Sequence, residues 1–585
     1  MHQKAVFLIF VITALTFANS LGNGFVGDDE VLFTHNAFYK SPQNIIRLFQ
    51  KSYLTQSNDV FMSFKTDFGS GSVAYRPILT LSYFLDYGMW KEKPFGYHLM
   101  NLVLHILNSF LVYFLFFFIG KDQHLALWGT LLFAVHPMRS EAVCSIGYRA
   151  DLLSTFFGLL SFLFFLKFKD RTRLRGIPFM MLSWLTYFLA VFSKESVIII
   201  PLLIFAYDFY YNPLTLNKLF GYLKRYYGGY IVISLFYLFI YFKVFPNTTL
   251  KDSGFLGGSL VTHVMTMLRI FWDYVFEFSL PFLVNVLPAL YAPTVDKFLD
   301  IRVICSVGIL LSFLFFIIKF FPSGKHLSFF LLWFLISYIP VSNIVPLVNP
   351  MAHRFMYFPS IGLSFVFMVL IERLCRAFKN LGRESKLGGI VRISGIALCV
   401  TTASLLNSLW KNNFIMASAV IKYFPDFYKG YTILGIEYFR ALDCQNAKFY
   451  LNKSLQLGSI EPRIQVMLGM CSLDQFELAR DYFIQAIREF PQDVAPYQGL
   501  GKLFLRHEKY QEAILSLEKS LEIAPAICAY EDLIKTYLAL GEKEKTKDIL
   551  VEASKNLKNQ EQLDYLQKII IQSSYANEKK KISDR

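Results

Sequence analysis

Long apolar runs recur along the chain up to Trp410, and they constrain the fold more than any other feature. Residues 4–21, 96–119, 177–192 and 355–372 are examples, each near the length that a helix needs to cross about 30 Å of hydrocarbon. With 55% hydrophobic residues and 62 Phe among 585 residues, the chain is too apolar for a water-soluble protein of this size. We therefore expect an all-α chain with a polytopic transmembrane helical bundle, followed by a water-soluble part.

Four basic segments between the apolar runs predict the orientation of the bundle: residues 167–175, 218–225, 319–325 and 373–386. Short loops rich in Lys and Arg stay on the cytoplasmic side of a membrane. Placing all four segments inside gives about eleven spans: 4–21, 96–119, 125–137, 151–166, 177–192, 197–211, 226–245, 303–318, 326–342, 355–372 and 390–409. The N-terminus is then cytoplasmic, and the chain after Trp410 lies outside.

Two segments of the bundle have a second interpretation. The run 4–18 is alternatively a cleaved signal peptide. Residues 265–290 are apolar enough for a span, but counting them would invert every later basic loop, so we expect an interfacial or re-entrant helix there.

Charge and cysteine usage restrict the class of protein further. The formal net charge is +15, but the basic residues lie in short connections rather than along one face or in a tail, which argues against nucleic-acid binding. The seven cysteines are odd in number and show no CxxC spacing. We interpret them as small buried residues.

The C-terminal part contains tetratricopeptide (TPR) units. Residues 494–527 fit a 34-residue unit, with matches at Tyr497, Leu500, Gly501, Phe504, Tyr510, Ala513, Leu517 and Pro525. Earlier units cover residues 431–451 and 476–491, and a weaker one begins at Tyr530, so we expect about three to four repeats. Such repeats stack into an α-solenoid with a groove that binds extended peptides, and the alternative is a spacer.

These patterns predict a division of the chain into four parts. Residues 1–409 form the transmembrane domain and residues 410–425 a linker. Residues 426–575 form the TPR domain, and residues 576–585 are a disordered tail.

Three carboxylates follow the first apolar run, at Asp28, Asp29 and Glu30. Adjacent acids repel one another and raise one pKa, which suits a general base. The alternative is a solvated turn or a helix N-cap, because Asp is a good capping residue.

A second polar segment carries His136, Glu141, Arg149 and Asp151 between two apolar runs. Arg149 has the geometry to bind a phosphate through two hydrogen bonds, with Glu141 or Asp151 orienting it. The alternative is a set of ion pairs that anchors the loop.

Further polar residues are expected on the same outer face or inside the bundle. Lys194 and Arg354 add cations at the ends of outer-facing spans. His98, Asn101, His105 and Asn108 lie on one helix face, which must turn toward the interior or a wet cavity. Hydrogen bonding between helices and substrate contact remain alternatives for this stripe.

We find no Gly-rich phosphate loop, HExxH or GxSxG motif, so nucleotide hydrolysis and serine or zinc hydrolase chemistry have no support.

Taken together, several segments resemble the transmembrane-and-TPR-containing O-mannosyltransferase-like proteins, which share the GT-C architecture. The matching segments, followed by the TPR units, are GDDEVLFTHN at 27–36, AYRPILTLSYFLDY at 74–87, GYHLMNLVLHILN at 96–108, HPMRSEAVCSIGYRADLL at 136–153, SKESVIIIPLLIFAYD at 193–208 and HRFMYFPSIGLSF at 353–365. The resemblance covers nearly the whole chain. It implies a polyprenyl-phosphate donor of mannose or another hexose, an acceptor hydroxyl on Ser or Thr of proteins, and transfer with inversion.

The resemblance implies roles for some residues, and the polar residues of the outer face and of the helix stripe predict roles for others. Asp28 and Asp29 match the catalytic acidic motif of the first outer loop. Arg149, Lys194 and Arg354 are the expected donor phosphate-binding cations. Supporting roles fall to His136, Glu141, Asp151, His98 and His105. No metal ligands are predicted, although a divalent metal bridging the acids and the phosphate is left open.

Two further questions stay open at this stage. The membrane is either a bacterial plasma membrane with a periplasmic TPR domain or an endoplasmic reticulum membrane with a lumenal one. The alternatives to a protein glycosyltransferase are a non-catalytic membrane-anchored TPR scaffold and a transferase that acts on a glycan or lipid acceptor.

Overall fold

The computed structural model describes residues 2–34, 37–49, 75–211, 226–244, 254–284, 294–295, 300–321, 324–347, 349–380, 386–459, 461–557 and 562–572. Within these residues the regular elements are all helices. The chain divides into two compact units, the first reaching Met416 and the second beginning at Ala417. The expected all-α fold, a helical membrane bundle followed by a solenoid, is confirmed.

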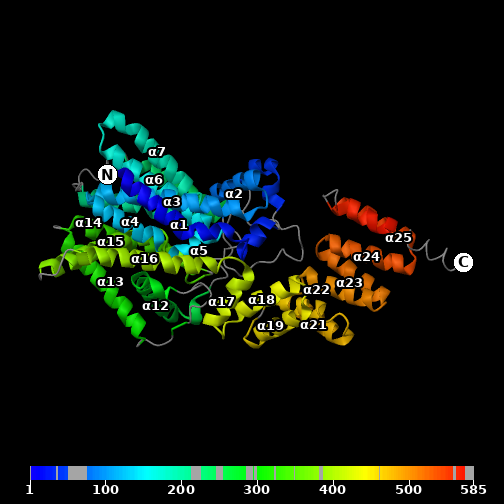
Figure 1. Cartoon of the computed structure of the whole chain (residues 1–585). Coiled ribbons are helices and arrows are strands. Elements are labelled where there is room, and N and C mark those ends of the chain that lie inside the picture. Colours follow the sequence, from blue (N-terminus) through cyan, green and yellow to red (C-terminus); the bar gives the residue numbers. More distant parts are fainter. Residues whose placement is uncertain are drawn as a thin grey trace. The chain divides into compact units, whose positions relative to one another are not determined.

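The first unit contains the apolar helices (Figure 1). They are α1 (His2–Phe17), α2 (Pro77–Trp90), α3 (Pro94–Gly120), α4 (Gln123–Val135), α5 (Ser140–Cys144), α6 (Arg149–Lys169), α7 (Arg173–Val191), α8 (Ile200–Tyr211), α10 (Gly228–Phe239), α12 (Leu260–Ser279), α13 (Ile301–Phe320), α14 (Lys325–Tyr338), α15 (Ser360–Asn380) and α16 (Lys386–Ser408). A helix lies at each of the predicted spans.

Five helices are long and apolar enough to cross a membrane: His2–Gly22, Pro94–Gly120, Arg149–Lys169, Ile301–Phe320 and Gly388–Ser408. Four shorter apolar helices accompany them, and the number of spans stays a prediction. Of an apolar stretch of 18 residues in each helix, 61% is buried in α3 and in α6, against 11% in α13 and in α16. The first two helices are therefore central in the bundle, and the last two are peripheral.

The N-terminal helix α1 is part of this bundle. The Asn19 side chain, just after α1, donates to the Ser404 carbonyl of α16 at 2.8 Å, and the His2 ring hydrogen-bonds the Tyr113 hydroxyl of α3 at 2.8 Å. These contacts join both ends of α1 to the bundle, and the choice between a membrane span and a signal peptide stays a prediction.

The segment expected to be interfacial or re-entrant contains α12. Its face with Phe271, Tyr274 and Phe278 is buried in a cluster with Phe334 and Tyr338 of α14. Residues 285–293 lie outside the described part of the chain. The helix is not among the candidate spans, and its depth in the membrane stays a prediction.

The second unit is a succession of antiparallel helix pairs, coloured yellow to red in Figure 1. Its helices are α18 (Tyr428–Arg440) with α19 (Cys444–Gln456), α20 (Pro462–Met470) with α21 (Phe476–Glu489), α22 (Val494–Arg506) with α23 (Tyr510–Ile523), and α24 (Ile527–Leu540) with α25 (Lys543–Asn556). The predicted units 431–451 and 494–527 each fall on one pair, the unit 476–491 falls on α21, and the weaker unit begins within α24.

Small residues allow the helices of each pair to approach closely. Ala447, Ala479 and Ala513 are fully buried. A Cβ added at Gly501 would lie 2.5 Å from the Leu517 side chain, so a larger residue here would force Leu517 to shift. The TPR spacing in the sequence thus reflects the packing within each pair.

Two local features differ from the sequence interpretation or add to it. Cys444 and Cys471 form a disulfide that joins α19 to the end of α20, so the interpretation of the cysteines as small buried residues was wrong for this pair. Cys528 is exposed, so the interpretation as a small buried residue was also wrong for Cys528.

The predicted linker contains α17 (Asn413–Tyr423). The tail at 576–585 lies outside the described residues, as does the basic segment 218–225.

Candidate active site

The acidic segment after α1 is held in place by the chain that leaves α16. The Gly24 amide donates to the Lys411 carbonyl at 3.0 Å, and the Gly27 amide donates to the Asn413 side chain at 2.9 Å. Gly27 adopts a φ of 59°, in the left-handed region that glycine populates without strain. The Asn413 amide group also donates to Glu30 at 3.0 Å. The three acids are therefore fixed at one end of the bundle.

Asp29 is completely buried against the loop between α5 and α6. Its carboxylate accepts the Gly147 amide at 2.6 Å, the Ile146 amide at 3.1 Å and the Ser145 hydroxyl at 3.4 Å. Burial raises the pKa of Asp29 to about 7, although the amides of Gly147 and Ile146 oppose this shift by stabilising the carboxylate. Both oxygens thus serve to hold the loop.

Asp28 is also buried, and its negative charge, like that of Asp29, acts on the Tyr148 hydroxyl. Burial raises the pKa of Tyr148, Arg354 lowers it, and the negative charges of Asp28 and Glu141 raise it further. The Arg354 guanidinium stands 3.9 Å from the centre of the Tyr148 ring. Tyr148 therefore lies near Asp28 of the first outer segment, Glu141 of the second and Arg354 of the last.

Arg354 belongs to the short helix η13 (His353–Met356), just before α15. Its guanidinium forms an ion pair with Glu141, and its backbone amide donates to the same carboxylate at 2.9 Å. Both side chains are almost fully buried. Glu141 thus fixes the position of Arg354, whereas sequence analysis expected Glu141 or Asp151 to orient Arg149.

Lys194 follows α7 and brings a second cation to this region. Its ammonium group pairs with Asp151 at 2.6 Å and stands 5.4 Å from the Phe355 ring, over which the Arg354 guanidinium lies at 5.0 Å. Burial lowers the pKa of Lys194, Asp151 raises it, and the nearby positive charges of Arg76 and Arg354 lower it further. Lys194 and Arg354, each paired with a carboxylate, therefore lie close together in one buried region.

A third ion pair borders this region and was missed by sequence analysis. Arg76 contacts both carboxylate oxygens of Glu195, at 2.6 and 3.1 Å. Burial alone would raise the pKa of Glu195, but Arg76 and then Lys194 lower it to about 2. Arg76 immediately precedes α2, in the AYRP segment of the motif, which is the signal that could have identified it.

Arg149 has different surroundings from the other two predicted cations. Its guanidinium pairs with Asp86 of α2 at 2.5 Å and donates to the Asn101 side chain at 2.7 Å and to the Tyr97 carbonyl at 3.0 Å. Both members of the ion pair are fully buried. These contacts fit an anchor between α2, α3 and α6, and phosphate binding by Arg149 stays a prediction. In the sequence, a single acid within an apolar segment, Asp86, indicated that a buried cation pairs with it.

The polar stripe on α3 points into the bundle, as expected. The ring of His98 hydrogen-bonds the Gly24 carbonyl at 3.2 Å, Asn101 donates to the Ser145 carbonyl at 3.0 Å, and the ring of His105 hydrogen-bonds the Ala134 carbonyl at 2.8 Å. Of the two open interpretations, these contacts fit hydrogen bonding that positions the outer loops.

His136 lies beside α12. Its ring stacks on Phe278 at 4.5 Å and hydrogen-bonds the Phe278 carbonyl at 3.1 Å. The preceding residue of α12, Glu277, pairs with His353 at 2.7 Å, a contact that sequence analysis missed. His136 and His353 thus connect α12 to the two outer loops that carry Glu141 and Arg354. Within the described part of the chain, no three His, Cys, Asp or Glu side chains are grouped closely enough to hold a metal ion.

Comparison with known proteins identifies relatives over most of the chain. Protein O-mannosyl-transferase TMTC3 of Mus musculus is 25% identical over 564 residues, which cover 88% of this chain and 55% of that protein. Protein O-mannosyl-transferase F38B6.6 of Caenorhabditis elegans is 22% identical over 443 residues, which cover 72% of this chain and 58% of that protein. Over a shorter stretch of 173 residues, Protein O-mannosyl-transferase TMTC4 of Mus musculus is 32% identical, covering 27% of this chain and 22% of that protein.

These similarities confirm the resemblance that the motifs indicated. No protein-family model matches the chain. The chain spans 55% to 58% of the length of the TMTC3 and F38B6.6 proteins.

Proposed function

We propose that this homologue of the protein O-mannosyl-transferases is an integral-membrane glycosyltransferase. It moves mannose or another hexose from a polyprenyl-phosphate donor to Ser or Thr hydroxyls of proteins on the outer or lumenal face. The observation that carries the proposal is the convergence of Asp28, Arg354 and Lys194, from three separate loops, at one end of an apolar helical bundle. The names of the relatives support the reaction class.

The reaction proceeds by direct displacement at the anomeric carbon. The acceptor hydroxyl oxygen forms the new bond to that carbon, while the bond from the carbon to the phosphate oxygen breaks and its electron pair leaves with the lipid phosphate. Asp28 receives the hydroxyl proton. We assign this role to Asp28 because backbone amides occupy both oxygens of Asp29, so that Asp29 positions the loop. General base catalysis typically contributes about 10²–10⁴ in rate.

The leaving phosphate requires cations rather than an acid, because it is already charged. Arg354 and Lys194 provide two positive charges above one aromatic ring. Glu141 and Asp151 hold these cations in fixed positions before the donor binds. Charges fixed in a partly dehydrated site stabilise developing negative charge more strongly than charges in water do.

The TPR unit is proposed to bind the acceptor polypeptide. Its stacked pairs are of the kind that present a concave surface to extended peptides. The Cys444–Cys471 disulfide supports placing this unit outside the cytosol, because disulfides persist in oxidising compartments.

The test is hexose transfer by the purified full-length chain. A polyprenyl-phosphate hexose donor is incubated with a Ser/Thr-rich peptide, and mass spectrometry detects the added hexose. Asp28→Asn should reduce transfer by about 10² or more, with the protein still folded. The matched control is Asp170→Asn, at an exposed acid that follows α6 at the other end of that helix, and it should retain full transfer.

Two results would overturn parts of this proposal. Full transfer by Asp28→Asn would remove the proposed base. No transfer by the unaltered chain to peptide, glycan or lipid acceptors would favour the membrane-anchored scaffold.

A further inference from the structure

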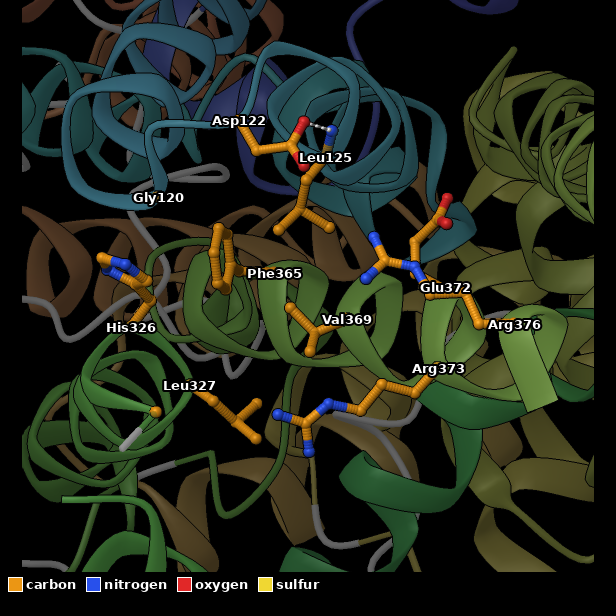
Figure 2. A pocket seen from close by; sticks show the side chains of 11 residues that line it. Gly120, Asp122, Leu125, His326, Leu327, Phe365, Val369, Glu372, Arg373 and Arg376 are labelled. Carbon is orange, nitrogen blue, oxygen red and sulfur yellow. Dashed lines mark hydrogen bonds between the residues drawn. The ribbon is translucent and has the colours of Figure 1, made fainter. Parts of the chain in front are cut away.

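A pocket with a volume of about 270 Å³ lies among α3, α4, α14 and α15, at the end of the bundle opposite the candidate active site. Figure 2 shows its lining. It is formed where α3 ends, where α4 and α14 begin, and by the second half of α15. The proposed sugar transfer assigns this pocket no role.

The lining combines an apolar part with charged groups. The apolar part consists of Leu125, Leu327, Phe365 and Val369. In Figure 2, Phe365 and Val369 lie between Leu125 on one side and Leu327 on the other, and the Arg373 side chain extends to the side of Leu327. The pocket therefore offers a hydrocarbon surface next to cationic groups.

The two acids of the lining are already engaged. Glu372 pairs with Arg392 at 2.6 Å and with His124 at 3.4 Å. Asp122 caps α4 by accepting the His124 and Leu125 amides at 2.9 and 3.0 Å. Neither carboxylate neutralises the arginines of the pocket.

Arg373 and Arg376 are exposed, and neither forms an ion pair with a residue in the described ranges. The Arg373 guanidinium stands 4.9 Å from the Phe320 ring, a contact with a neutral group. Lys121 adds a positive charge close to His326 of the lining. The pocket therefore carries an excess of positive charge.

We propose that this pocket binds an anionic phospholipid from the surrounding membrane. Arg373 holds the headgroup phosphate, for which a planar guanidinium group is well suited. Arg376, whose side chain ends on the other side of Val369 in Figure 2, adds to the positive charge that attracts the headgroup. The apolar side chains contact the first part of an acyl chain. A basic pocket between membrane helices is a recognised setting for lipid headgroups, and the combination of cations with an apolar surface favours an amphiphile over a free anion.

The test measures lipid binding directly and involves no sugar transfer, so its outcome is independent of the proposed reaction. The purified full-length chain in neutral detergent is incubated with phosphatidylglycerol or with phosphatidylcholine, and native mass spectrometry counts the bound lipids. The unaltered chain should retain phosphatidylglycerol and bind phosphatidylcholine more weakly. The variant Arg373→Gln/Arg376→Gln should bind phosphatidylglycerol about tenfold more weakly.

The matched control removes two cations from a surface outside the pocket. Arg171 and Arg175 are exposed at the start of α7, so Arg171→Gln/Arg175→Gln should leave phosphatidylglycerol binding unchanged. A second variant, Val369→Trp, fills the apolar part without altering charge and should also weaken lipid binding.

Three outcomes would overturn the proposal. One is equal binding by the Arg373→Gln/Arg376→Gln variant and by its control. Another is displacement of the lipid by glycerol phosphate at equal concentration, which would identify the ligand as a free phosphate. The third is unchanged binding by the Val369→Trp variant.

Discussion

Asp29 accepts two backbone amides of the loop between α5 and α6, whereas its neighbour Asp28 is buried and its negative charge acts on Tyr148. Two adjacent acids thus have different surroundings at the residue scale. Asp28 is suited to proton transfer, and Asp29 is suited to holding a loop. The same contrast separates the cations, because Arg354 and Lys194 gather near Phe355 while Arg149 pairs with Asp86.

Asp29 should make the stability of the folded chain depend on pH. Its pKa is raised from 3.8 to about 7 in the folded state, so between these values the folded state binds more protons than the unfolded state. Stability is therefore highest below about pH 4 for this group and falls as pH rises toward 7. Thermal unfolding of Asp29→Asn and of the unaltered chain in detergent, measured from pH 5 to 8, should show this fall only in the unaltered chain. Parallel pH profiles would contradict it.

Arg354 should be sensitive even to a substitution that conserves charge. Arg354→Lys keeps a positive charge but loses the planar, two-pronged hydrogen bonding that suits phosphate. We expect a fall in kcat/KM for the lipid donor of about 10-fold or more, with less effect from Lys194→Arg. Steady-state kinetics with varied donor concentration measure this. An unchanged kcat/KM for Arg354→Lys would place the donor phosphate elsewhere.

At the scale of elements, the outer loops are positioned by helices that meet through buried polar contacts. Arg149 at the start of α6 contacts α2 and α3, and the histidines of α3 contact the carbonyls of Gly24 and Ala134. In the second unit, a disulfide connects α19 to the end of α20. The pattern of apolar residues in the sequence predicts none of these contacts between segments.

The Arg149–Asp86 pair should contribute to stability more than to donor affinity. Asp86→Asn leaves a buried, uncompensated guanidinium, a change that typically costs about 3–5 kcal/mol. We expect a lower unfolding temperature for Asp86→Asn and for Arg149→Lys, with the donor KM nearly unchanged in the folded fraction. A raised donor KM without loss of stability in Arg149→Lys would restore the phosphate-binding prediction.

The disulfide should stabilise the TPR unit. Cys444 and Cys471 are 27 residues apart, and closing a loop of this size stabilises a fold by about 3.5 kcal/mol. Cys444→Ala/Cys471→Ala should therefore lower the unfolding temperature of the chain, and dithiothreitol should affect the unaltered chain but not the variant. Cys528→Ala serves as the control because Cys528 is free and exposed. Maleimide labelling of Cys444 and Cys471 without prior reduction would contradict the bond.

At the scale of the whole molecule, the described helices separate two ends of the bundle. One end carries the acidic segment, Arg354 and Lys194. The other carries basic residues such as Arg373 and Arg376, together with the pocket among α3, α4, α14 and α15. This separation fits an orientation with the basic end in the cytoplasm.

A topology assay tests that orientation. A reporter active only outside the cytoplasm should be active when fused after Trp410 and silent when fused near Arg173, because the acidic loop and the TPR unit must share one compartment for the proposed reaction. Fluorescence or enzymatic activity of the two fusions in intact cells gives the measurement. The reverse pattern would place the proposed site on the cytoplasmic face.

The sequence by itself determined the helical membrane bundle and the TPR repeats, because apolar run length and 34-residue periodicity are local properties of the chain. It also identified the acidic segment and most charged residues of the candidate site. It did not reveal that Arg354 pairs with Glu141, 213 residues away, or that Arg149 pairs with Asp86. Only the tertiary structure decided these partners. A buried ion pair forms where folding brings distant loops together and excludes water. The spacing of residues along the chain predicts neither which loops meet nor where water is excluded.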